Sequence, residues 1–403
     1  MIDERDRLRR AAEHFDPPTD ALDRLLRRKD RRDKGRRIAA GALAAVIALS
    51  VLGALATAIV RDDATAPGGA GVVSAAPTIA YGAFVPVDGA FPHLRSIAAA
   101  APGFVAVGDT SDWGQTDPVW FSADGTSWRR APESTGPRSA NLWEVIAGGP
   151  GFVTVGLDGQ GEPAAWTSPD GTTWTPASVT LPNGGRDGGS MDGLIRVPGG
   201  LLAWGRVGDD AYIWTSIDGT DWRPIADEKP FGGEGEQMCC DVSMSSDGFV
   251  AIGFERPSGS LGFGHAVAWT SPDGQSWTKN FLTGPEPLDD WVTAPLRPLV
   301  STDGFLFGSW KGMFASTDGV AWERQHPPAE VGKPFVDEVE SGTALVAAAA
   351  DGTIWISADG GAWVKAGEGP ASLYSLAVGP RGLLVLSSPG GDQQAMEFAS
   401  ALD

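Results

Sequence analysis

The sequence predicts an all-β protein: a seven-bladed β-propeller whose N-terminal strand closes the last blade, preceded by a single transmembrane helix and a short cytoplasmic helical tail. Three observations predict this. One seven-residue motif occurs six times at intervals that suit propeller blades, helix signals disappear after residue 77, and one uncharged stretch lies near the N-terminus. The expected domains are a tail (1–37), a membrane span (38–60), a linker (61–77) and the propeller (78–403).

The first 37 residues form a basic tail. They contain 13 Lys and Arg against 9 Asp and Glu, a net charge of +4, so the rest of the chain carries −24. Leu22, Leu25 and Leu26 fall at helical spacing behind Asp20, a suitable N-cap, so a short amphipathic helix is expected. Two interpretations stay open: the helix binds a cytoplasmic regulator such as a sigma factor, or it is a solvated helix beside the membrane.

Residues 38–60 are 23 residues without a charge, long enough at 1.5 Å per residue to cross a hydrocarbon core of about 30 Å. A cleavable signal peptide is the competing interpretation, because small-residue Ala-Thr-Ala sequences occur at 56–58 and 64–66. The apolar stretch is longer than such peptides use, which favours an uncleaved anchor. Its preceding flank is rich in Arg and Lys, so the N-terminus is expected in the cytoplasm and the propeller outside it.

The repeated motif is Ser-x-Asp-Gly-x-x-Trp. The intervals between successive Asp residues are 46, 48, 55, 45 and 41, and periods of 40 to 50 residues are typical of propellers or solenoids. Asp-Gly between alternating apolar runs favours a tight hairpin, because Gly accepts a positive φ and the Asp carboxylate can cap backbone N–H groups of its own turn. The Trp then buries a large apolar face. The motif is therefore interpreted as a folding device.

A second pattern, two short apolar runs around a Gly turn, precedes each motif and supplies two further strands. Each unit thus has four antiparallel strands, which is one propeller blade. A seventh unit follows the sixth motif but stops before its fourth strand. Residues 78–87 precede the first blade and have no blade of their own, so they are expected to close the seventh blade and leave no free sheet edge.

The motif resembles the Asp-box, or BNR repeat, of sialidases, sortilin-type receptors and photosystem II assembly factor propellers. The resemblance covers the whole predicted propeller, although the usual box has one more residue between Asp and Gly. It implies that the boxes are structural and lie on the turns between third and fourth strands, away from the ligand face. That role falls to Asp124, Asp170, Asp218, Asp273, Asp318 and Asp359.

The resemblance also raises sialidase-type hydrolysis as an alternative, with three arginines on the substrate carboxylate, a Tyr nucleophile and an Arg-Ile-Pro motif. The sequence has no Arg-Ile-Pro, and the nearest segment contains Arg95. Of three Tyr, only Tyr374 is predicted on an innermost strand. Arg95, Arg196 and Arg297 fall on innermost strands of alternate blades, but in different registers. Binding is therefore favoured over hydrolysis, and enzymatic activity is left open.

The loops predict the ligand face. The turns that carry the motif are short and uniform, whereas the loops at the other ends of the strands, here called the variable face, are long and diverse. Function concentrates on loops held by a rigid scaffold. Trp113, Asp290 and Trp291 lie in these loops, where they could stack on a sugar, anchor a protein or only cover the blade tops.

A register comparison adds a ring of candidates. Counting back nine residues from the Phe or Leu that opens each second strand reaches residues that differ in chemistry between otherwise similar blades; blade six has no clean register. A variable position of this kind predicts a ring at the mouth of the central channel, or residues that only pack the loops. The ring is Arg95, Trp143, Asp192, Cys240, Leu296 and Tyr374.

Cofactor and metal chemistry receive no support from the sequence. Cys239 and Cys240 are adjacent, so they form either a strained vicinal disulfide or reduced thiols, and with four scattered His they do not make a zinc site. No cofactor and no nucleic-acid partner is expected. The function expected is a membrane-anchored, exported module that binds a protein or glycan at the cell envelope. The alternatives are a sialidase-like hydrolase and a transmembrane sensor that relays to a cytoplasmic regulator.

Overall fold

The computed structural model describes residues 80–402 with gaps, of which the longest are 110–118, 258–264 and 283–296. The remaining gaps are 89–92, 133–135, 138, 183–186, 227–228, 246, 300–303, 310–311, 342–343, 359–361 and 391–392. The chain divides into two compact units, Met1–Val73 and Ser74–Asp403. The predicted tail, span and linker lie outside the described residues. Within the described part, no helix combines the length and apolar character that a membrane crossing requires.

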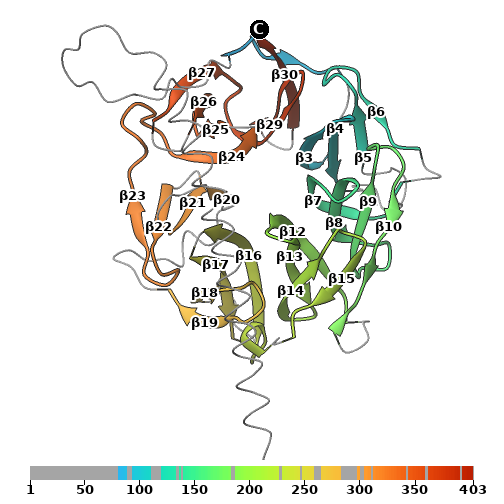
Figure 1. The fold of residues 1–403 in the computed structure, drawn as a ribbon, viewed down its shortest axis with the longest axis vertical. Coiled ribbons are helices and arrows are strands. Elements are labelled where there is room, and N and C mark those ends of the chain that lie inside the picture. The colour runs from blue at the N-terminus through green and yellow to red at the C-terminus, as the bar shows by residue number, and fades with distance from the viewer. Residues whose placement is uncertain are drawn as a thin grey trace, which may run out of the picture. The chain divides into compact units, whose positions relative to one another are not determined.

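Seven antiparallel sheets surround a central axis, and the all-β seven-bladed propeller is confirmed (Figure 1). Each blade is given from its innermost strand outward. Blade 1 is β3 (Leu94–Ala100), β4 (Gly103–Gly108), β5 (Val119–Ser122) and β6 (Arg129–Arg130). Blade 2 is β7 (Asn141–Gly148), β8 (Gly151–Leu157), β9 (Pro163–Ser168) and β10 (Thr175–Pro176). Blade 3 is β12 (Gly189–Val197), β13 (Gly200–Val207), β14 (Asp210–Ser216) and β15 (Asp221–Pro224), with β11 (Ser178–Val179) added in parallel to β15.

The second half of the ring repeats the pattern. A 3₁₀ turn, η2 (Lys229–Phe231), leads into blade 4, which is β16 (Glu236–Ser245), β17 (Gly248–Arg256), β18 (His265–Ser271) and β19 (Thr278–Phe281). Blade 5 is β20 (Arg297–Leu299), β21 (Phe305–Ser309), β22 (Gly312–Ser316) and β23 (Glu323–Gln325). Blade 6 is β24 (Phe335–Ser341), β25 (Ala344–Ala349), β26 (Thr353–Ser357) and β27 (Val364–Glu368). Blade 7 is β28 (Leu373–Gly379), β29 (Gly382–Gly390) and β30 (Gln393–Leu402), completed by β1 (Ala80–Tyr81) and β2 (Val85–Pro86).

The ring closes as predicted. Both N-terminal strands pair antiparallel with β30, with Tyr81 opposite Ala401 and Val85 opposite Phe398. The Gly82 N–H donates to the Ser400 carbonyl at 2.9 Å. Each innermost strand contacts the innermost strands of both neighbouring blades, including β28 against β3, so the seven blades form an unbroken circle. Because the two ends of the propeller pair within one sheet, backbone hydrogen bonds hold the first and last blades together.

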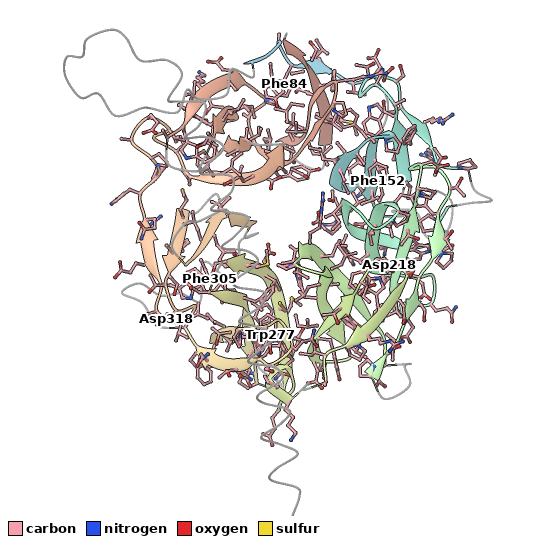
Figure 2. The ribbon with its side chains drawn as sticks, viewed as in Figure 1. Phe84, Phe152, Asp218, Trp277, Phe305 and Asp318 are labelled. Atoms are coloured by element: carbon pink, nitrogen blue, oxygen red, sulfur yellow. The ribbon has the colours of Figure 1, made fainter. Side chains whose placement is uncertain are left out.

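The Ser-x-Asp-Gly-x-x-Trp turn has the expected local network. In blade 1 the Gly125 N–H donates to Ser122 Oγ at 2.8 Å, and Asp124 Oδ1 accepts from the N–H groups of Thr126 (2.8 Å) and Ser127 (2.7 Å). The Trp128 indole N–H donates to the Gly125 carbonyl at 2.9 Å. The same hydrogen bond from the glycine N–H to the serine Oγ recurs in the turns of Asp170, Asp218, Asp273 and Asp318. The sixth turn, with Asp359, lies outside the described residues. Asp318 sits toward the outer rim, away from the axis (Figure 2).

These turns also join neighbouring blades. A Cβ added to Gly171 in blade 2 would lie 2.6 Å from the Phe121 ring and 2.8 Å from a Val105 methyl, both in blade 1. The glycine at residue 125 approaches Phe398 of blade 7 in the same way, at 2.4 Å. All five described motif glycines have a φ between 72° and 87°, which glycine alone adopts without strain. The motif therefore needs Gly both for the turn and for close packing against the preceding blade.

Candidate functional site at the channel mouth

The described residues of the candidate ring coincide with β-bulges in the innermost strands of blades 1, 2, 3, 4 and 7. In five blades the pairing of the innermost strand with the next strand skips the residue named from the sequence, and in blade 6 it skips Val336, nine residues before Leu345. A bulge leaves one residue outside the ladder and re-aims its side chain. The described members of this bulge ring are Arg95, Trp143, Asp192, Cys240, Val336 and Tyr374. Leu296 lies outside the described residues.

Three members of the bulge ring meet across consecutive blades. The Tyr374 hydroxyl of blade 7 donates to the Leu94 carbonyl of blade 1 at 3.2 Å. The Arg95 guanidinium of blade 1 lies 4.8 Å from the ring centroid of Trp143 in blade 2, a cation–π contact. Arg95 also donates to Asp109 Oδ2 at 2.7 and 3.0 Å, while about half of its side chain (49%) remains exposed. Tyr374, Arg95 and Trp143 therefore form one continuous strip, here called the aromatic–arginine strip.

The other predicted candidates are placed differently. Burial raises the pKa of Asp192 to about 6, against the opposing effects of a hydrogen bond from Ser190 and the charge of Arg206. The backbone of Cys240 lies in β16, and its side chain is outside the described part. Cys239 is buried, and its thiol donates to the Asp241 carbonyl at 3.8 Å. Trp113, Asp290 and Trp291 lie outside the described residues, so their predicted role stays a prediction.

A second ring lies one residue further along each innermost strand, and four of its members line a cavity at the channel. Its members, here called the channel ring, are Ser96, Glu144, Gly193, Asp241, Asp337 and Ser375, with Arg297 at the same register in blade 5. Ser96 and Asp337 link neighbouring blades through their side chains. Ser96 Oγ donates to Glu144 Oε1 of the next blade at 2.6 Å, and Asp337 Oδ2 accepts from the Leu376 N–H of the next blade at 2.9 Å.

The channel ring borders a cavity of about 650 Å³ that follows the innermost strands. Glu144, Asp241, Asp337 and Glu338 line it at the level of the ring, while Arg196 lines it nearer the opposite face. The register comparison between blades predicts the bulge ring but not the channel ring. The sequence signal for the channel ring is a polar residue directly before a run of Ile, Val and Leu. That signal can be interpreted only when the position of the bulge is known, because the bulge sets which of two neighbouring residues faces the channel.

Hydrolysis of an anionic sugar finds little support in this geometry. Sialidase-type chemistry gathers arginines around the substrate carboxylate, whereas the charged residues that line this cavity are four carboxylates and one arginine, an excess of negative charge that repels an anion. Arg95 is engaged with Asp109 and Trp143, and Tyr374 with a backbone carbonyl. The described residues contain no group of three or more His, Cys, Asp or Glu side chains that could hold a metal ion. The site presents a binding surface of aromatic, cationic and acidic groups.

The chain matches no protein-family model and no curated protein sequence. Among solved structures, it is similar to YCF48 bound to a D1 peptide, at 14% sequence identity and a TM-score of 0.48, with 82% of this chain and all of that chain covered. YCF48 from Cyanidioschyzon merolae is 16% identical with a TM-score of 0.43, over 78% of this chain and 98% of that one. The WD40 propeller domain of Doa1 is 12% identical with a TM-score of 0.46, over 79% and 97%.

Proposed function

We propose that this chain is a membrane-anchored propeller, exported from the cytoplasm, that binds a protein partner on its variable face at the mouth of the central channel. The observation that carries the proposal is the aromatic–arginine strip. Tyr374 of blade 7, Arg95 of blade 1 and Trp143 of blade 2 form one strip on the face with the diverse loops, although Tyr374 is far from the other two in sequence.

The residue types of the strip suit protein recognition. Tyr, Trp and Arg are the side chains most enriched among residues that dominate binding energy at protein interfaces. The Trp143 indole N–H is buried and has no hydrogen-bond partner among the described residues. Because each strip residue stands on a bulge fixed by two β-strands, its orientation costs little entropy on binding.

The anchoring part of the proposal rests on the sequence. The uncharged stretch 38–60, its basic flank and the acidic remainder support a single-pass protein with the N-terminus in the cytoplasm. The repeated turns support kinship with Asp-box propellers, since the motif carboxylates act only in local structure. An exported binding face would meet other envelope proteins directly.

The test is capture of a partner from the native envelope by full-length protein, after cross-linking, with Trp143→Ala and Arg95→Ala as variants. The chain offers a matched control in Arg130→Ala, because Arg130 stacks on Trp120 at 4.7 Å in the outer strands of blade 1. We expect one captured protein to be lost in both strip variants and kept in the control. Capture that is equal in all three variants would refute the site. If the protein instead binds a glycan on an array, and both strip variants lose that binding, the partner is a sugar and not a protein.

A further inference from the structure

The channel ring is broken in blade 3, and a buried tryptophan takes the place of the missing side chain. Blade 3 has Gly193 where its neighbours carry polar side chains, and Trp204 lies directly opposite on β13. A Cβ added to Gly193 would lie 2.2 to 2.8 Å from Cζ2, Cε2 and Cη2 of Trp204. The carbon edge of the indole's six-membered ring therefore fills the ring position.

Trp204 combines burial with an unused donor. Its side chain is only 5% exposed, and it lines the same 650 Å³ cavity as the four carboxylates. Its Nε1–H has no hydrogen-bond partner among the described residues. Nε1 itself has almost no accessible surface, so the part of Trp204 that lines the cavity is the carbon edge of the indole.

The cavity carries an excess of negative charge. Glu144, Asp241, Asp337 and Glu338 line it. Arg196 opposes them, which leaves a formal charge of −3 among the residues that line the cavity in the described part of the chain. In a partly enclosed site of low dielectric, such an excess attracts a cation much more strongly than it would on an open surface.

We infer that the mouth of the channel accepts a lysine or arginine side chain of the protein partner, and this inference rests on the proposed function. The cation enters among Glu144, Asp241 and Asp337, and the same partner segment packs against the part of the Trp204 indole that lines the cavity. The aromatic–arginine strip then contacts the flanking residues of that segment at the rim. The volume suits this occupant, since small-ligand sites span about 300 to 1,000 Å³.

The probes that test the inference are two capped pentapeptides, acetyl-Gly-Gly-Lys-Gly-Gly-amide and the same peptide with norleucine, the neutral analogue of lysine. Full-length protein labelled with ¹⁵N at the indole nitrogens is titrated with each, and Trp204→Phe assigns the Trp204 resonance. We expect the lysine peptide to shift that resonance in a saturable way that weakens with added salt, and the norleucine peptide to leave it in place.

Two variants locate the charge. Asp337→Asn and Glu144→Gln keep an oxygen that accepts the hydrogen bonds from Leu376 and Ser96, so the blades stay joined. Each variant is expected to bind the lysine peptide with an affinity about tenfold lower than wild type, as for the loss of a close charge pair at an interface. The matched control is Glu323→Gln, because Glu323 is exposed on the outer strand β23 and its neutralisation changes the net charge equally. It should change the affinity less than about twofold, since salt screens distant charges.

The outcomes separate this inference from the proposed function. Equal shifts with both peptides, no shift with either, or full affinity in Asp337→Asn would overturn the cationic anchor. A partner that depends on Trp143 but binds unchanged to Asp337→Asn would also overturn it, while the binding face would stand. A lysine-specific shift of Trp204 with no captured partner would support the anchor and refute the protein-binding function as proposed.

Discussion

Replacement of Gly171 by alanine tests how the repeated turn holds the blades together. Gly171 has a φ of 76°, and an alanine forced into this left-handed region loses about 1–2 kcal/mol. The added Cβ would also lie 2.6 Å from the Phe121 ring and 2.8 Å from Val105, both in the preceding blade. Overpacking of this kind costs about 1–3 kcal/mol. The expected loss in the free energy of unfolding is therefore about 2–5 kcal/mol.

Gly161 in the same blade is the matched control. Its φ is 83°, but a Cβ there would meet nothing within 4 Å. Gly161→Ala should therefore lose only the backbone contribution of about 1–2 kcal/mol. The difference between the two variants isolates the contact between blades from the strain of the turn.

The assay is urea unfolding of full-length protein, followed by the fluorescence of its 16 tryptophans and by circular dichroism. The urea midpoint of Gly171→Ala should fall below that of Gly161→Ala, at similar slopes. Equal midpoints for the two variants would refute the reasoning, because they would mean that the glycine serves the turn alone.

Three further predictions follow from the same geometry. The pKa of Asp192 is about 6 in the folded state against about 3.9 in the unfolded state, so the folded state binds the Asp192 proton more tightly. The free energy of unfolding therefore falls as pH rises from about 4 to above 6, by at most about 3 kcal/mol. Asp192→Asn should remove this pH dependence from the urea midpoints, and an unchanged pH dependence would contradict the burial of Asp192. Partial burial opposes ionisation of Asp170, but hydrogen bonds from Thr173 and Thr172 outweigh it and lower the pKa of Asp170 to about 2. The ionised carboxylate therefore stabilises the fold above about pH 4, and this stabilisation is lost toward pH 2. The stability of Asp170→Asn should fall less than that of wild type on acidification, and an identical fall would count against the hydrogen-bond network. Deletion of residues 80–87 removes both strands that close blade 7, so thermal unfolding should begin earlier and hydrogen exchange of β30 should rise, whereas wild-type protection of β30 would argue against closure.

Much of the fold could be predicted because the information is local and repeated. Each Ser-x-Asp-Gly-x-x-Trp segment specifies a turn through its own side chains, and six copies at similar spacing specify the architecture. The closing role of residues 78–87 followed from counting strands, since the seventh unit lacks one. These features depend on hydrogen bonds and apolar alternation within a few residues, which the sequence shows directly.

The channel could be predicted only in part because it depends on contacts between blades. The register comparison found the variable position in six blades, and five of those residues are bulged in the structure. Blade 6 gave no register because small residues surround Leu345, so Val336 was missed. The sequence also does not show that the Trp204 indole occupies the space beside Gly193, because Trp204 lies on another strand. The parallel strand β11 was not foreseen either, because it pairs across two blades.

A photo-reactive amino acid tests the binding face most directly. Benzoylphenylalanine at position 143 reports what touches the aromatic–arginine strip in the native envelope, and the same residue at position 120 reports the outer strands of blade 1. The account predicts one protein cross-linked from position 143, with its adduct next to a lysine or arginine, and none from position 120. Cross-linking of the same protein from position 120 alone, or equally from both positions, would contradict it.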